Sequence, residues 1–155
     1  VDSPAGIEQG FRNAIAGADR AIVVTTPEVS AIRDADRIIG LIESSGLPEP
    51  HLLINRYRLD MVERNQMLDR EDIIDILALP LIGTVPYHDS VIISSNCGIP
   101  VAYDETNQLS EIFNRIAGRV LGNTDLDFFE LSEIGQNSLW DRFKRIIGFT
   151  HGVAV

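Results

Sequence analysis

Three short stretches place polar side chains where predicted strands end, and their residue types suit ligand binding. They are Asp2-Ser3-Pro4-Ala5-Gly6, Asn55-Arg56 and Pro86-Tyr87. In a parallel sheet the carboxyl ends of the strands open on one rim, and ligands bind at that rim. We therefore expect the three stretches to lie at one edge of a sheet.

Each of these residues has a chemical role open to it. The Asp2 carboxylate could hold a metal-bound water, and the Asn55 amide could read the edge of a base. Arg56 and Pro86 could enclose the ring of that base between them. An aspartate ahead of proline and glycine is more often a local turn cap. Both interpretations of Asp2 therefore stay open.

The last part of the chain carries a compact amphipathic pattern. At 100° per residue, five apolar side chains fall within an arc of roughly 120°. They are Leu139, Trp140, Phe143, Ile146 and Ile147. Arg142 and Lys144 flank the arc, while Asp141 and Arg145 lie opposite it. Such a helix is typical of a bilayer interface, where each cation adds on the order of 1 kcal/mol at an anionic leaflet. A helix docked on its own domain or on a partner shows a similar pattern.

Several kinds of active site have no counterpart in the sequence. A phosphate-binding P-loop needs a glycine-rich loop followed by lysine and serine or threonine, but the only lysine is Lys144. His51, His88 and His151 lack the spacing of metal ligands. Cys97 is expected to be a small buried residue rather than a nucleophile. These 155 residues therefore contain no P-loop motif.

The composition is that of a globular domain with an acidic body. The hydrophobic fraction is 45%, the charged fraction is 23% and the net charge is −10. Residues 1–122 carry ten arginines and eighteen acidic residues, whereas 138–155 carry three basic residues and one acidic residue. An acidic body argues against broad contact with nucleic-acid phosphates. A single cysteine allows no internal disulfide, which favours a reducing compartment.

The elements that must position these residues alternate between strand and helix. Short apolar runs predict strands over 21–26, 51–55 and 81–85, and the turn after Val1 predicts the end of a further strand. Helical spacing predicts helices over 8–17, from 28 to about 44, after an Asp69 cap, and from about 106 to 121. Ile22, Leu52 and Ile82 recur at the length of one βα unit. The sequence therefore predicts an α/β fold with an open, mostly parallel sheet flanked by helices.

Composition also divides the chain into three parts. Residues 1–122 form the predicted α/β domain, 123–137 an acidic linker, and 138–155 an amphipathic tail.

Seven motifs in this order resemble the carboxyl-terminal part of MinD-type ATPases, the division-site-selection members of the deviant-Walker MinD/ParA family. The resemblance covers residues 1–122, and the terminal amphipathic helix agrees in kind. The motifs are Asp2-Ser3-Pro4-Ala5-Gly6-Ile7-Glu8, Thr25-Thr26-Pro27-Glu28-Val29-Ser30, Arg33-Asp34-Ala35-Asp36-Arg37-Ile38, Asn55-Arg56, Met67-Leu68 before Glu71-Asp72-Ile73, Ile82-Gly83-Thr84-Val85-Pro86, and Ser95-Asn96 before Gly98-Ile99-Pro100-Val101.

The resemblance implies a P-loop NTPase-like sheet that binds ATP and Mg²⁺, dimerises with a second copy through its nucleotide face, and hydrolyses ATP. It implies binding to an anionic membrane surface, recruitment of the division inhibitor MinC and release by MinE. The implied location is cytoplasmic, peripheral on the inner face of the cell membrane or its plastid equivalent. No nucleic-acid partner is implied.

The resemblance also assigns roles to individual residues. Asp2 resembles the switch II aspartate near magnesium, and Asn55, Arg56 and Pro86 resemble the adenine pocket. The surface shared by dimer and regulators is matched by Arg33, Asp34 and Asp36. The membrane-targeting helix is matched by Leu139, Trp140, Arg142, Phe143, Lys144, Arg145, Ile146 and Ile147.

In this family the phosphate loop and its lysines precede the position of Asp2. We therefore expect this sequence to be part of a longer ATPase, without a complete catalytic set of its own. Two other functions stay open: a non-catalytic module that binds membranes or partners, and a ParA-type partition ATPase. The acidic body counts against the second of these.

Overall fold

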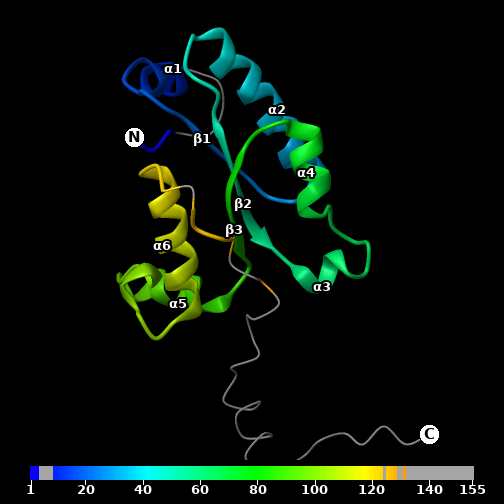
Figure 1. The fold of residues 1–155 in the computed structure, drawn as a ribbon, viewed down its shortest axis with the longest axis vertical. Helices are drawn as coiled ribbons and strands as arrows, with labels where there is room; N and C mark the ends of the chain where they lie inside the picture. The colour runs from blue at the N-terminus through cyan, green and yellow to red at the C-terminus, as the bar shows by residue number, and fades with distance from the viewer. Residues whose placement is uncertain (4–8, 124, 129–130, 132–155) are drawn as a thin grey trace, which may run out of the picture.

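The structure is a computed structural model that describes residues 1–3, 9–123, 125–128 and 131. Strands and helices alternate along the described chain (Figure 1). The elements are α1 (Gln9–Ala16), β1 (Ile22–Thr25), α2 (Val29–Ser44), β2 (His51–Tyr57), α3 (Leu59–Val62), α4 (Arg70–Leu77), β3 (Leu81–Pro86), α5 (Asp89–Cys97), the 3₁₀ helix η1 (Val101–Tyr103) and α6 (Gln108–Val120).

The three described strands form one parallel sheet in the order β1-β2-β3. Ile22 lies opposite His51, and Leu52 lies opposite Leu81. Parallel neighbours need a long crossover, and α2 and α4 lie in the two crossovers of this sheet. Figure 1 shows α2 and α4 on one side of the sheet and α5 and α6 on the other. The predicted open parallel α/β sheet is confirmed.

Two apolar clusters, one on each side of the sheet, hold these layers together. In the first, Leu52 and Ile54 of β2 and Ile73 of α4 are fully buried. In the second, Ile82 of β3 packs with Ile112 and other residues of α6. The two sides are separated by strands whose residues alternate between them. Pairing along both edges and the full burial of Leu52 and Ile54 therefore make β2 the centre of the described sheet.

The predicted helix signals hold in detail. The Asp69 carboxylate accepts a hydrogen bond from the Asp72 amide at 2.7 Å, which confirms the predicted cap of α4. Gly122 has φ 96°, a left-handed conformation that ends α6 as expected for a terminating glycine. The turn is closed by the Asn123 amide, which donates to the Gly118 carbonyl at 3.0 Å.

Four expectations differ from the structure. The 21–26 strand was expected to be buried, but Ile22 and Val24 are 43% and 56% exposed, because no described element covers that face of β1. Residues 1–3 belong to no strand, so the strand end predicted at Val1 is not seen. Cys97 is exposed rather than buried, because it is the last residue of a helix that has no buried side chain. The pattern also did not predict α3, α5 and η1.

The two parts predicted beyond residue 122 are described only in part. Asp125–Phe128 and Leu131, from the predicted linker, are described, whereas the predicted amphipathic helix lies outside the described residues. Its eight candidate membrane residues therefore keep the roles given to them by sequence. Within the described part of the chain, no helix combines the length and hydropathy needed to cross a membrane.

The close approach of β3 to α6 predicts opposite effects for two glycine-to-alanine changes. A Cβ at Gly83 would lie 2.4 Å from Ile116 Cγ1, whereas a Cβ at Gly40 in α2 meets nothing within 4 Å. Overpacking should make Gly83→Ala less stable by about 1–3 kcal/mol. Gly40→Ala should be more stable by up to about 1 kcal/mol, because alanine favours the helix. Urea denaturation measures both, and equal stabilities would contradict the packing described.

Candidate nucleotide-binding site

A β-bulge lies where β2 and β3 end. Ile54 is paired with Thr84, and Tyr57 is paired with Pro86. Three steps along β2 therefore span two steps along β3, which leaves one extra residue on β2. Bulges are frequent beside active sites, where they redirect a side chain. This register shift falls on the two stretches, Asn55-Arg56 and Pro86-Tyr87, that the sequence predicts to bind a ligand, while a second shift lies earlier, between Leu52 and Leu53.

Arg56 absorbs the extra residue by adopting a left-handed backbone conformation with φ 55°. The Asn55 side-chain oxygen accepts a hydrogen bond from the Arg56 amide at 2.9 Å, which fixes the local turn. A non-glycine residue in this region costs roughly 1–2 kcal/mol. Strain of this kind is typical of ligand-binding sites. The exposed Arg56 side chain is thereby held at the rim of the sheet.

Pro86 lies directly across from this bulge. Its neighbour Tyr87 donates its backbone amide to the Tyr57 carbonyl at 2.9 Å, so the pairing of the two strands continues past the bulge. Pro86 itself is buried. The structure therefore brings Asn55, Arg56 and Pro86 to adjacent strand ends, as predicted, although their role in binding a base stays a prediction.

Two tyrosines lie at this rim: Tyr87 belongs to the predicted Pro86-Tyr87 stretch, whereas sequence alone does not single out Tyr57. Tyr57 is 7% exposed, and burial raises the pKa of its phenol, while nearby Arg70 acts in the opposite direction. Tyr87 is 49% exposed and lies next to Pro86. In the sequence, the available signal is an aromatic residue directly after the proline that ends a predicted strand. Tyr87 thus offers a flat surface at the site.

A cluster of charged side chains comes directly after the bulge in the sequence. The Asp60 carboxylate accepts hydrogen bonds from Arg58 Nε at 3.1 Å, Arg58 Nη2 at 2.8 Å and Arg64 Nη2 at 2.6 Å. The Arg58 hydrogen bond is the main cause that lowers the pKa of Asp60. A lowered folded-state pKa means that the pair stabilises the fold above the ordinary aspartate pKa, and that this contribution is lost as pH falls. The cluster orients the chain that leaves β2.

Asp2 is not brought to this site. Residues 1–3 are exposed and form no strand. Figure 1 shows the amino-terminal residues away from the tip of the β2 arrow, where Arg56 and Tyr57 lie. No group of three or more metal-binding side chains occurs among the described residues. The predicted role of Asp2 at magnesium therefore has no geometric partner in the described structure.

Helix α2 presents the second predicted surface. Its apolar stripe, which includes Ile32 and Ala35, faces the core, while Arg33, Asp34 and Asp36 are exposed. Asp34 forms a long ion pair of 3.8 Å with Arg37, and both side chains are more than three-quarters exposed. An exposed pair of this kind contributes little to stability. These charges are therefore available to a partner, and that use of them stays a prediction.

Known proteins resemble the chain in both sequence and fold, although no protein-family model matches it. The septum site-determining protein MinD of Synechocystis is 47% identical over 146 residues, which is 94% of this chain and 54% of that protein. The solved MinC:MinD cell division protein complex of Aquifex aeolicus is 42% identical, with a TM-score of 0.78, and covers 83% of this chain and 53% of that one. The chain belongs to the MinD family.

The chain spans about half the length of the relatives it matches. The Pyrococcus horikoshii MinD solved with Mg-ADP is 24% identical, has a TM-score of 0.69 and supports the fold alone.

The left-handed backbone at Arg56 predicts a reversal of the usual order of alanine and glycine. At φ 55°, Arg56→Gly should be more stable than Arg56→Ala by about 1 kcal/mol, because glycine adopts this conformation freely. The matched control is Arg37, an exposed residue inside helix α2. There the glycine variant should be less stable than the alanine variant by about 1 kcal/mol. Chemical denaturation of the four variants tests this. The same order at both positions would show that Arg56 is not strained.

Proposed function

We propose that this sequence is the carboxyl-terminal part of a MinD-type ATPase that helps to place the cell-division septum. The observation that carries the proposal is the strained bulge that holds Arg56 beside the Tyr57–Pro86 pair at the sheet rim. Ligands of open α/β sheets bind at the carboxyl ends of the strands. The similarity to the septum site-determining protein MinD of Synechocystis supports the proposal.

In the proposed complex, the base of ATP lies at Asn55, Arg56 and Pro86. Asn55 reads the edge of the base, and the Arg56 and Pro86 side chains enclose its ring. Residues outside this sequence supply the phosphate loop, and Mg²⁺ neutralises the phosphates. Asp2 acts near that magnesium. This role requires the amino-terminal residues to lie at the rim, away from their position in the described structure.

The proposed protein acts as a homodimer that forms when ATP is bound. The exposed charges of α2, at Arg33, Asp34 and Asp36, contribute to the dimer and to regulator contacts. MinC, which the Aquifex MinD binds in its solved complex, is recruited as a division inhibitor, and MinE releases the protein from the membrane. The location is cytoplasmic and peripheral on the inner membrane face.

Two other functions have weaker support. A non-catalytic module that binds membranes or Min partners is favoured by the lack of a P-loop motif in these 155 residues. A ParA-type partition ATPase would need contact with nucleic acid, which the net charge of −10 disfavours.

The absence of a P-loop motif predicts that the 155-residue chain neither hydrolyses ATP nor binds it tightly. Backbone amides and a lysine at the phosphates supply much of nucleotide affinity in such sites. A protein of full MinD length that carries this sequence should hydrolyse ATP. Calorimetric titration and phosphate release measure the two properties. Tight ATP binding by the 155-residue chain would contradict the assignment of phosphate binding to residues outside it.

The amphipathic tail predicts binding to vesicles that carry anionic lipid. Phe143→Glu should weaken co-sedimentation at least about tenfold, because burial of such a side chain contributes roughly 1.5–3 kcal/mol. Ser138→Glu is the matched control, since it adds the same charge outside the apolar arc. Its binding should fall by only a fewfold. Equal effects of the two changes would show that the tail binds by charge alone or does not anchor the protein.

A further inference from the structure

The segment that follows α6 returns along that helix and contacts it closely. Arg115 Nη1 donates to the Asp127 carbonyl at 3.0 Å. Arg119 Nη2 donates to the Leu126 carbonyl, and its Nη1 donates to the Ile82 carbonyl of β3 at 3.3 Å. One guanidinium therefore joins the returning segment to the edge strand of the described sheet.

Phe128 extends this contact across the edge of the sheet. The Arg119 guanidinium carbon lies 3.5 Å from the centroid of the Phe128 ring, and that of Arg70 lies 6.0 Å from it. Arg119 belongs to α6 and Arg70 begins α4, so the ring lies between helices from opposite sides of the sheet. Leu131 packs against both apolar clusters.

The helix surface is shaped for this segment. A Cβ at Gly118 would lie 2.6 Å from Leu126 Cδ1, so the glycine leaves room for the leucine side chain. Burial lowers the pKa of Arg119, which shows that the guanidinium is partly desolvated under the segment. A partly desolvated cation with carbonyl acceptors and an aromatic ring forms a specific contact rather than loose surface cover.

We propose that Asp125–Phe128 and Leu131, here called the strap, fasten the predicted membrane helix to the β3 edge and thereby orient the domain on a lipid surface. This inference rests on the proposed membrane function. Only residues 132–137 separate the strap from the predicted tail at 138–155. Six residues span at most about 20 Å, whereas release of the strap would allow about 50 Å from Asn123.

The short connection between the strap and the tail determines which edge of the domain faces the membrane. The tail, when inserted, keeps the β3 edge and the strap closer to the lipid than the far end of α2. Arg70 and Arg115 at this edge are ion-paired with Glu71 and Glu111, and Arg119 is engaged by the strap, so the orientation depends on the short connection rather than on free charge. The device acts whether or not the tail is helical before it meets the membrane.

Limited proteolysis tests the strap itself. Chymotrypsin should cut the 155-residue chain slowly after Phe128, and at least about tenfold faster in Arg119→Leu and Gly118→Val. Arg119→Leu removes the donors and the stacked cation, and Gly118→Val displaces Leu126. The control Val120→Ala changes a half-exposed residue of the same helix. Equal cutting rates after Phe128 in all four proteins would overturn the strap. Tyr57 is buried, so cutting after Tyr57 indicates that a variant has unfolded globally. If Arg119→Leu or Gly118→Val unfolds in this way, the milder variant Gly118→Ala is used in its place.

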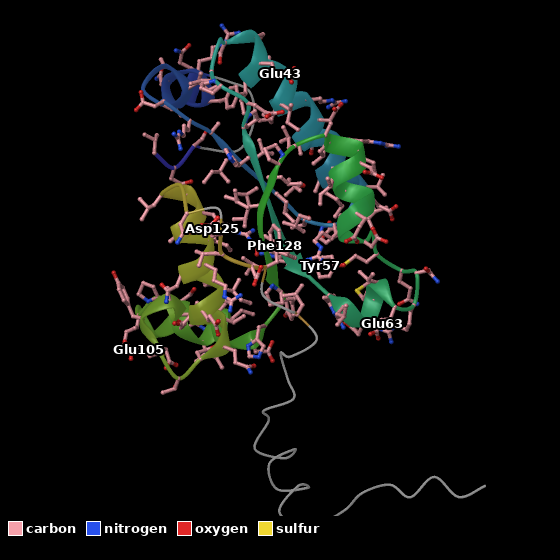
Figure 2. The ribbon with its side chains drawn as sticks, viewed as in Figure 1. Glu43, Tyr57, Glu63, Glu105, Asp125 and Phe128 are labelled. Atoms are coloured by element: carbon pink, nitrogen blue, oxygen red, sulfur yellow. The ribbon has the colours of Figure 1, made fainter. Side chains whose placement is uncertain are left out.

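Energy transfer to acceptor-labelled headgroups tests the orientation. With Cys97→Ser as background, dyes are placed at Asp125→Cys and Glu43→Cys, which lie apart in Figure 2. On vesicles with anionic lipid, transfer should be at least about twofold greater from position 125 than from 43. Gly118→Val should shrink that difference. Equal or reversed transfer in the strapped protein overturns the orientation. If the chain binds no vesicles, both the orientation on lipid and the membrane function are overturned. The proteolysis result still tests whether the strap packs on α6.

Discussion

The pairing of β2 with β3 is the constraint on which the rest of the structure depends. β2 is the middle strand of the described sheet, and its Leu52 and Ile54 side chains are fully excluded from solvent. Its neighbour β3 carries Gly83, which admits Ile116 of α6 to close range. Because both strands are fixed by packing, the mismatch between their ends cannot be relieved by sliding. It is absorbed at Arg56, in a left-handed conformation that a free chain would avoid. The core therefore supplies the rigidity that holds the candidate site.

The same edge of the sheet also organises the end of the described chain. Arg119 reaches from α6 to the Ile82 carbonyl and to the returning segment, and Phe128 lies against its guanidinium. A polar, acidic stretch thus gains a fixed path over β3 through a few directional contacts rather than through a large apolar area. The candidate site and the strap lie on the two strands of one pair. A change in that pairing would affect both.

Much of the fold could be predicted from local pattern, because β-branched runs and helical spacing report burial directly. The cap at Asp69 and the terminator at Gly122 also follow from local backbone chemistry. Helix α5 could not be predicted in this way, because it buries no side chain and so has no apolar stripe. The rule that strand ends share a rim placed Asn55, Arg56 and Pro86 correctly. It could not show the bulge, which arises only when two strands about 30 residues apart are packed together. The same rule did not place Asp2, because residues 1–3 form no strand in the described structure.

The central claim is that the bulge at Arg56 and Pro86 forms the base contact of an ATP site. Photolabelling with 8-azido-ATP tests it most directly, in a protein of full MinD length that carries this sequence. Peptide mapping should find the label on residues 55–57 or 86–87, and excess ATP should prevent its attachment. Label confined to other peptides, with ATP protection there, would contradict the account.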